Sequence, residues 1–321
     1  MDTLSHDFTG ETNREPILHV RKLNTTFITG NGSVRAVNGL DFDLKEKDRM
    51  AIIGESGCGK SVLAQTILKL LPKNALVSGE IVFHNRDLLK TGPDHMVKIR
   101  GGKIGLIPQQ ISSLDPLMKI KGQIQKAIQP NGGSQDKRQL YRKAFDLLNS
   151  VGLDPHLSNR YPHQLSGGMN RRVLISMGIA QNPDLLIADE PTTGLDTILR
   201  NKTVKLIDNV TAGRSLLLIT HDIGAACICE NLAVMYAGEI IEIGPAQDIL
   251  DDPRHPYTQG LMSSMPSRGM SSIPGMSPSL IQLPTGCRFH PRCPYAKERC
   301  STHHPGIRED NRGVRCHYAC S

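Results

Sequence analysis

The stretch GESGCGKS, residues 54–61, decides the fold of this chain. It matches the pattern of a glycine, four residues and Gly-Lys-Ser that forms a phosphate-binding loop. The short run before it is rich in β-formers, and the residues after it, up to Leu71, carry an apolar face of helical period. Strand, glycine loop and helix together open a βαβ unit, so we expect an α/β fold of the P-loop NTPase kind.

The chemistry of this stretch, called the phosphate loop below, follows from its residue types. Glycines let backbone N–H groups converge on phosphate oxygens, and the helix that begins there adds a positive dipole end. Lys60 neutralises β- and γ-phosphate charge, and Ser61 supplies its hydroxyl to Mg²⁺. The predicted nucleotide-binding residues are Gly54, Glu55, Ser56, Gly57, Cys58, Gly59, Lys60 and Ser61.

Composition sets wider limits on the protein. The chain has 321 residues, of which 38% are hydrophobic and 21% charged, which suits one large domain and a smaller part. The net charge of +7 fits nucleic acid, an anionic membrane face, phosphate ligands or simply a solvated surface. Residues 1–16 lack an apolar signal region and are expected to be a disordered tail. Because we also find no apolar run near the ~18 residues of a membrane span, we expect a cytosolic chain, in which disulfides are disfavoured and a cysteine group more often binds metal or does redox work.

Two apolar runs predict buried parallel strands with functional tips. LLIADE, residues 185–190, delivers Asp189 to a metal shell, and Glu190 on the other side of the strand tip can polarise an attacking water. SLLLIT, residues 215–220, ends at His221. Several helical patterns between residues about 95 and 180 predict a helical subdomain.

LSGGM, residues 165–169, predicts a second anion site. Ser166 is a natural N-cap, and the following glycines leave N–H groups open at a helix start. An ordinary capped helix start is the simpler interpretation of this motif alone. Because the chain already has a phosphate site at Lys60, the second site implies a phosphate held by another subunit.

The set GESGCGKS, LSGGM, LLIADEP, TTGLD and ITHD, in this order, resembles the nucleotide-binding subunit of ABC transporters over residues about 17–255. The resemblance implies that ATP is the nucleotide and that the chain is an ATPase. It also implies that Ser166, Gly167 and Gly168 close on ATP held by the opposite subunit. Asp196 then lies in the loop that links the two sites.

The same resemblance assigns the catalytic residues. Glu190 acts on the attacking water, His221 contacts the γ-phosphate, and Gln109 senses Mg²⁺ and water and moves with a membrane partner. Ser61, Gln109 and Asp189 are the implied Mg²⁺ residues. Relatives carry an aromatic residue that stacks on adenine; Phe27 is the candidate here, with a core position as the alternative. The loop around Gln109 also departs from the family, since Pro108 stands where an aromatic residue is common.

Residues 256–321, called the C-terminal extension below, begin with a strap rich in proline and methionine and end with a cysteine group. The group has 5, 6 and 15 residues between its successive members, Cys287, Cys293, Cys300 and Cys316. From spacing alone, an iron–sulfur cluster, Zn²⁺ and unligated thiols stand about equal. HPYTQGLMSSMP and the cysteine-rich tail resemble the oligopeptide, dipeptide and nickel branch of ABC importers, which implies a [4Fe–4S] cluster with Zn²⁺ as the alternative.

We therefore expect an ATP-hydrolysing subunit, peripheral to the cytoplasmic face of the membrane, that powers import of peptides or a related solute such as a nickel or metal chelate. The resemblance implies as partners two transmembrane permease subunits, a second ATPase chain and an extracytoplasmic substrate-binding protein. The alternative is a soluble ABC ATPase of nucleic-acid repair, translation or iron–sulfur assembly. An aromatic content of 4% with a single phosphate loop counts against a nucleic-acid partner.

Overall fold

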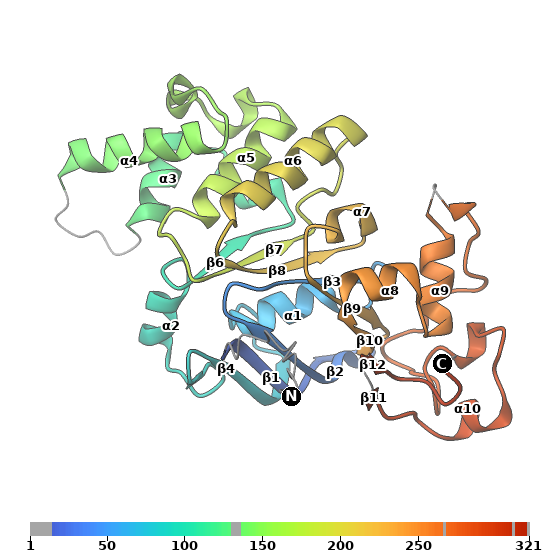
Figure 1. Ribbon diagram of the computed structural model, residues 1–321. Helices are drawn as coiled ribbons and strands as arrows, with labels where there is room; N and C mark the ends of the chain where they lie inside the picture. Colours follow the sequence, from blue (N-terminus) through green and yellow to red (C-terminus); the bar gives the residue numbers. More distant parts are fainter. Residues whose placement is uncertain (1–14, 130–135, 266–267, 310–311, 320–321) are drawn as a thin grey trace, which may run out of the picture.

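Two β-sheets and the helices around them form the protein (Figure 1). The computed structural model describes residues 15–129, 136–265, 268–309 and 312–319. The tail expected at residues 1–16 therefore lies outside the described residues, apart from Glu15 and Pro16, where the first strand begins.

The larger sheet has eight strands in the order β11-β12-β10-β9-β3-β8-β7-β6. Its five consecutive strands from β9 to β6 run parallel, and β10, β12 and β11 continue the sheet in antiparallel pairing. This arrangement confirms the expected α/β class. The strands are β3 (Arg49–Ile53), β6 (Ile104–Ile107), β7 (Leu185–Asp189), β8 (Ser215–Thr220), β9 (Asn231–Tyr236), β10 (Glu239–Pro245), β11 (Arg308–Glu309) and β12 (Gly313–Val314).

The smaller sheet is antiparallel, with the order β2-β1-β4-β5. Its first two strands form a long hairpin in which Thr29 pairs with Gly32 at the turn. Register shifts along this hairpin mark β-bulges or irregularities, which increase the local twist of the strands. The strands are β1 (Pro16–Thr29), β2 (Gly32–Lys45), β4 (Ala75–Phe83) and β5 (Arg86–Asp87).

Helices cover the larger sheet and form the part of the molecule farthest from the smaller sheet, where α3 and α4 lie (Figure 1). The α-helices are α1 (Lys60–Ile67), α2 (Pro93–Ile99), α3 (Ile120–Ile128), α4 (Lys137–Ser150), α5 (Gly167–Gly178), α6 (Thr197–Val210), α7 (Ile223–Ala226), α8 (Ala246–Asp251), α9 (Pro256–Ser263) and α10 (Glu298–Thr302). Short 3₁₀ helices are η1 (Ile111–Ser113), η2 (Pro155–Asn159), η3 (Pro162–Gln164) and η5 (His290–Arg292). Within residues 95–180, β6 belongs to the larger sheet, and the longer helices of that range, α3, α4 and α5, follow from Ile120 onward.

The larger sheet is buried on both faces. Because side chains alternate along a strand, Met50 and Ile52 of β3 face the core shared with the smaller sheet. Ala51 and Ile53 face the core shared with the helices. Both faces of β3 are therefore dry, which explains its uninterrupted apolar sequence.

Helix α1 ends four residues earlier than the sequence predicts. The apolar period continues to Leu71, but α1 stops at Ile67, and Lys69 takes a left-handed conformation with φ 50°. The N–H of Leu70 donates to the carbonyl of Gln65, a helix-terminating bond of the Schellman type. Local backbone geometry therefore ends the helix, and Leu70 is left 47% exposed.

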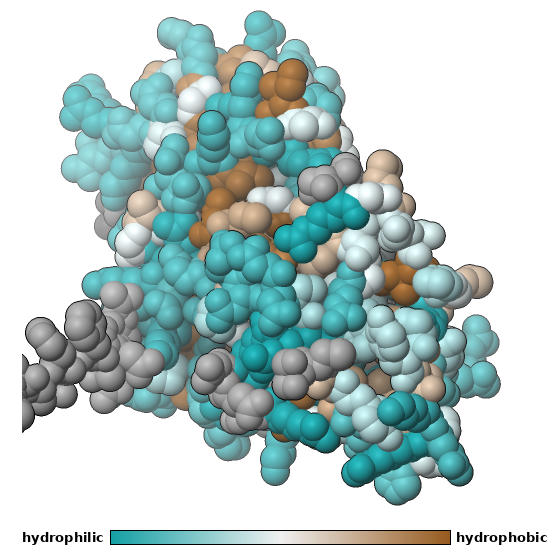
Figure 2. Space-filling model, turned by 45° about the vertical axis from the view of Figure 1, so that its right-hand side comes forward, coloured by the Kyte–Doolittle hydropathy of each residue, from teal (hydrophilic) through white to brown (hydrophobic). Residues whose placement is uncertain are grey.

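The C-terminal extension packs beside the larger sheet (Figure 1). Its strand β12 pairs with β10, and its Phe289 is buried against Tyr236 and Tyr257. The surface on this side is mainly hydrophilic, with apolar side chains in separate small patches (Figure 2). In the part of the chain that the structure describes, the helices all lack the combination of length and apolar content needed to cross a bilayer.

Candidate functional site

The phosphate loop connects the end of β3 to the start of α1, as the sequence predicts. Gly54 and Gly59 have φ values of 157° and 106°, and a Cβ atom at either position would lie within 2.2 Å of a backbone oxygen. Only glycine fits such backbone and such space. These two glycines fix the curvature of the loop around the N-terminus of α1.

Lys60 and Ser61 begin α1 and point to different partners. The buried Lys60 Nζ donates to the carbonyl oxygens of Gly54 at 2.7 Å and Glu55 at 3.0 Å. Ser61 Oγ donates to Asp189 Oδ1 at 2.9 Å. The structure therefore joins the phosphate loop to the tip of β7, although 128 residues separate the two in the chain.

Glu190 follows β7 in an unusual conformation. Its φ of 48° lies in the left-handed region, where a non-glycine residue stores strain that is typical of functional sites. Its side chain is 8% exposed and accepts hydrogen bonds from Thr193 Oγ1 at 3.1 Å and His221 Nδ1 at 2.6 Å. Lys60 Nζ lies 3.8 Å from the other carboxylate oxygen. Three sequence motifs thus meet at one carboxylate.

Asp189 and Gln109 border one cavity of about 280 Å³, which Ser61 also lines. Burial raises the pKa of the Asp189 carboxyl and the neighbouring Glu190 charge adds to this, against the hydrogen bond from Ser61. Two buried acids side by side favour a cation. A hydroxyl and a carboxylate at the carboxyl ends of parallel strands are ligands that suit Mg²⁺.

Ser166 caps α5, as the sequence predicts, by accepting a hydrogen bond from the N–H of Met169 at 3.3 Å. Gly167 and Gly168 form the first turn of this helix. Asp196 is exposed and caps α6 by accepting from the N–H of Leu199 at 2.9 Å. Among the described residues, neither cap residue hydrogen-bonds to the phosphate loop of the same chain.

Phe27 lies on β1 of the smaller sheet, opposite Val34 of β2 and Ala75 of β4. The residue is half-buried. Adenine stacking and core packing therefore both stay predictions for Phe27.

The four predicted cysteines surround one small cavity. Cys287, Cys293, Cys300 and Cys316 all line it. Burial and the proximity of the other three cysteines raise the pKa of Cys287 to about 11. Within the described ranges, however, no three His, Cys, Asp or Glu side chains form a group that could hold a metal ion. Cys320, a spare cysteine in the sequence, lies outside the described residues.

Arg171 is a residue whose role the sequence did not predict. It is 2% exposed on α5, and its Nη1 donates to the carbonyl oxygens of Pro108 at 3.0 Å and Gln109 at 2.9 Å. Burial lowers its pKa. The signal in the sequence that could have revealed this role is the position of Arg171, a charged residue on the apolar, inward face of the helix. It ties the helix of LSGGM to the loop that carries Gln109.

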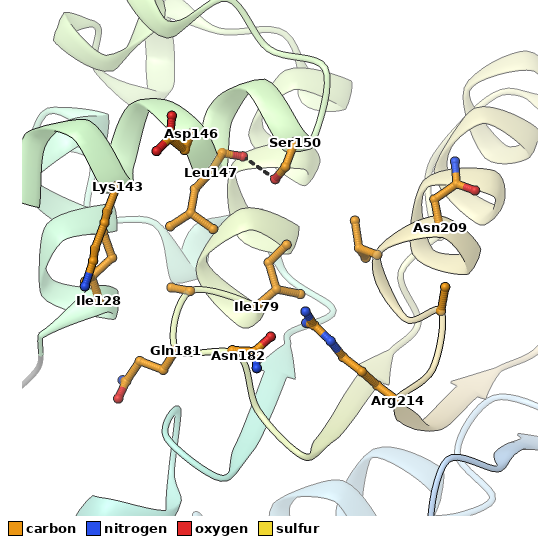
Figure 3. A pocket seen from close by; sticks show the side chains of 13 residues that line it. Ile128, Lys143, Asp146, Leu147, Ser150, Ile179, Gln181, Asn182, Asn209 and Arg214 are labelled. Atoms are coloured by element: carbon orange, nitrogen blue, oxygen red, sulfur yellow. Dashed lines mark hydrogen bonds between the residues drawn. The ribbon is translucent and has the colours of Figure 1, made fainter.

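A larger cavity of about 860 Å³ lies elsewhere, among α4 and the C-terminal ends of α5 and α6 (Figure 3). Leu147 points into it from α4, Asn182 from the segment after α5, and Arg214 from the segment between α6 and β8. None of the residues predicted to bind ATP or a metal ion lines this cavity. The chemistry of the motifs therefore belongs to the edge formed by the strand ends, not to this cavity.

The phosphate loop is joined through Ser61 to Asp189, and the strained Glu190 contacts His221 at the carboxyl ends of adjacent parallel strands. This arrangement defines a P-loop nucleotide hydrolase. The model of the ABC transporter family matches residues 37–193. The model of the oligopeptide/dipeptide transporter C-terminal region matches residues 241–300.

Curated relatives match along nearly the whole chain. The dipeptide transport ATP-binding protein DppD of Bacillus subtilis (strain 168) is 39% identical over 94% of this chain and 94% of its own length. The oligopeptide transport ATP-binding protein OppD of the same organism is 40% identical over 87% of this chain and 82% of its own. The chain therefore belongs to the ABC transporter ATP-binding family, in the group that carries this C-terminal region.

Solved structures agree with this assignment. The dimeric ATP-binding cassette MJ0796, in a post-hydrolysis state with ADP and Pi, has a TM-score of 0.65 at 28% identity, covering 71% of this chain and 98% of that chain. The cassette cbiO1 from Clostridium perfringens, part of an ABC transporter complex, has a TM-score of 0.62 at 27% identity over 74% of this chain and 92% of its own. The P-loop fold and the ATPase assignment are thereby confirmed.

Proposed function

We propose that this chain is the ATP-hydrolysing subunit of a peptide importer. The observation that carries the proposal is the joint presence of an ABC cassette and the transporter C-terminal region, with relatives named for dipeptide and oligopeptide transport at 39–40% identity. The reported relatives name peptides and not nickel, so peptide is the substrate class we choose.

Glu190 orients and deprotonates the attacking water in this proposal. Thr193 Oγ1 and His221 Nδ1 both donate to its Oε2, so the carboxylate meets the water in one orientation. Lys60 stands 3.8 Å from it and balances charge on the transferring phosphoryl group. His221 and Gln109 position the water and the γ-phosphate.

Ser61 and Asp189 would hold Mg²⁺, with Gln109 at the edge of the same cavity. When bound, Mg²⁺ neutralises charge on the β- and γ-phosphates. The phosphate loop, from Gly54 to Ser61, wraps the phosphates with its N–H groups. We assign adenine stacking to Phe27, a half-buried aromatic residue on β1.

The LSGGM helix serves a second ATPase subunit. Ser166, Gly167 and Gly168 open the N-terminus of α5 to an anion, and in the described part of this chain they do not bond to its own phosphate loop. MJ0796, the structural neighbour, is described as a dimer. Two chains, similar or identical, therefore trap ATP between the phosphate loop of one and the signature of the other, and Asp196 links the two sites.

Closing and reopening this pair drives two permease subunits, to which an extracytoplasmic protein delivers the peptide. Arg171 supports the coupling, because it joins the signature helix to the Gln109 loop, which we place against the permease. The chain attaches peripherally to the cytoplasmic face through these partners.

Co-purification tests the assembly. We expect the tagged chain, expressed from its own genomic neighbourhood, to be recovered from detergent extracts with hydrophobic permease subunits. Recovery in a complex with RNA or with iron–sulfur assembly proteins instead would contradict the proposal and favour the soluble alternative.

We also propose that Cys287, Cys293, Cys300 and Cys316 hold a [4Fe–4S] cluster. Four thiols around one cavity form the donor set of such a cluster. A single Zn²⁺ would need its sulfur ligands about 3.8 Å apart, the tetrahedral spacing for Zn–S bonds of about 2.3 Å. A [4Fe–4S] cluster would fix the segments that carry these four cysteines, within residues 287–316, to one another.

Elemental analysis distinguishes the two metals. Anaerobically purified protein is expected to contain iron and acid-labile sulfide and to lose both in Cys300→Ser. Zinc without iron in the wild-type protein would overturn the cluster in favour of a zinc site.

A further inference from the structure

Residues of the C-terminal extension hold one residue of the phosphate loop, Glu55. Arg292 Nη1 donates to Glu55 Oε2 at 3.0 Å, and Arg292 Nη2 donates to Glu55 Oε1 at 3.1 Å. The hydroxyl of Ser277 also donates to this carboxylate. The backbone N–H of Glu55 donates to the hydroxyl of Tyr257 at 3.0 Å. Three separate segments of the extension therefore converge on a single residue.

Arg292 itself is fixed in one orientation. Its side chain is 7% exposed, and its Nε donates to the carbonyl of Pro274 at 2.9 Å. The guanidinium lies 5.8 Å from the ring centre of Tyr236 and 6.0 Å from that of Phe289. A planar guanidinium so enclosed presents both of its outer nitrogens to a carboxylate in a bidentate pair, which is the strong form of this interaction.

The pair acts on the residues that bind phosphate. Lys60 Nζ donates to the carbonyl oxygens of Gly54 and Glu55. Any movement of Glu55 therefore shifts the carbonyls that hold the Lys60 ammonium. The backbone N–H groups of the loop bind phosphate only in a set direction, so fixing Glu55 fixes the loop that receives the nucleotide.

Charge gives the pair a second effect. Burial raises the pKa of the Glu55 carboxyl, but hydrogen bonds from Arg292 and Ser277 outweigh burial, so this pKa lies below its ordinary value. Glu55 therefore stays ionised inside a loop that binds anions. Arg292 neutralises it, and without Arg292 an unpaired carboxylate would repel the phosphates.

We propose that Arg292 is a positioning residue of the ATP site, which acts through Glu55 to tighten nucleotide binding by this chain. Arg292 immediately precedes Cys293 in the chain. The cysteine site is therefore linked to the phosphate loop through Arg292 and its ion pair with Glu55. It concerns nucleotide affinity and therefore stands apart from the transported substrate and from the metal bound by the cysteines.

Binding of fluorescent ADP with Mg²⁺ to the full-length chain tests the proposal, since ADP is not turned over and needs no permease. We expect Arg292→Ala to weaken ADP binding about tenfold. Arg299→Ala is the matched control: it removes an exposed cation that also directly precedes a site cysteine, Cys300, and we expect wild-type affinity.

A double-mutant cycle separates positioning from general structural damage. Glu55→Gln breaks the same ion pair from the side of the phosphate loop, so it is expected to weaken ADP binding as well, but less than Arg292→Ala does, because it leaves no unpaired carboxylate to repel the phosphates. In the Glu55→Gln background, Arg292→Ala is expected to have no further effect. The proposal would be overturned if Arg292→Ala weakened ADP binding by the same factor in the Glu55→Gln background as in the wild-type protein. It would also be overturned if Arg292→Ala alone bound ADP with wild-type affinity. Should Arg292→Ala not fold, Arg292→Lys keeps the charge without the bidentate geometry and enters the same cycle.

Discussion

Glu190 is the residue on which the proposed chemistry depends. We expect Glu190→Gln to keep ATP binding, because the amide has the same shape, and to reduce turnover at least about a hundredfold, because the amide cannot accept the proton. Phosphate release measures the turnover, and size-exclusion chromatography with ATP should show a more stable pair of ATPase subunits. Asp184→Asn is the control: it also replaces an acid by its amide, but at the residue before the start of β7. Undiminished hydrolysis by Glu190→Gln would refute the role.

At this scale the sequence predicts most residues that lie within a motif and few that act from a distance. Ser61, Asp189, Glu190 and His221 end or begin elements whose order is visible in the sequence, and the structure places them in contact. Arg292 pairs with a residue 237 positions away. No local pattern marks such a pair, because it arises from how the extension packs on the core.

The helix α5 is the element that we assign to a second subunit. We expect Ser166→Arg to leave binding of fluorescent ADP within about twofold of wild type, because the chain's own phosphate loop is untouched. ATP-dependent pairing of subunits should be lost, because an arginine side chain fills the anion site at the helix N-terminus. Ser150→Arg, exposed at the end of α4, is the control. A loss of ADP binding in Ser166→Arg would show that the signature serves its own chain.

The strand β10 joins the extension to the larger sheet. Its Glu242 is fully buried and accepts hydrogen bonds from the N–H groups of Arg254 and His255, each at 2.9 Å, while Arg312 lies 3.9 Å away. We expect Glu242→Ala to lower the free energy of unfolding by about 3 kcal/mol, since it leaves buried donors and a buried cation without their acceptor. Urea unfolding measures this change. Glu298→Ala, an exposed acid on α10, should have almost no effect, and an equal loss in both variants would contradict the account.

Element boundaries were less predictable than element types. The β-strand before the phosphate loop and the helix after it are where the sequence predicts them. The end of α1 is not, because a left-handed residue at Lys69 stops the helix while the apolar pattern continues. Strand β12, with two residues, is too short to carry any period.

At the scale of the whole molecule, the carboxyl ends of parallel strands gather the ATP chemistry at one edge, and the extension reaches that edge from the side (Figure 1). The sequence predicted residues 256–321 as a smaller part added to the ATPase domain. The structure shows this part paired with the larger sheet through β12 and packed on it through Phe289. The phosphate loop and the cysteine group thus belong to one continuous framework.

The most direct test of this account is ATP-driven peptide uptake by vesicles that contain the purified complex of this chain with its permease and binding-protein partners. We predict that labelled dipeptide accumulates only when ATP and Mg²⁺ reach the face that carries this chain, and that Glu190→Gln in this chain abolishes accumulation while the complex still assembles. Uptake that continues unchanged with Glu190→Gln, or a wild-type complex that hydrolyses ATP and accumulates no peptide, would contradict the central claim.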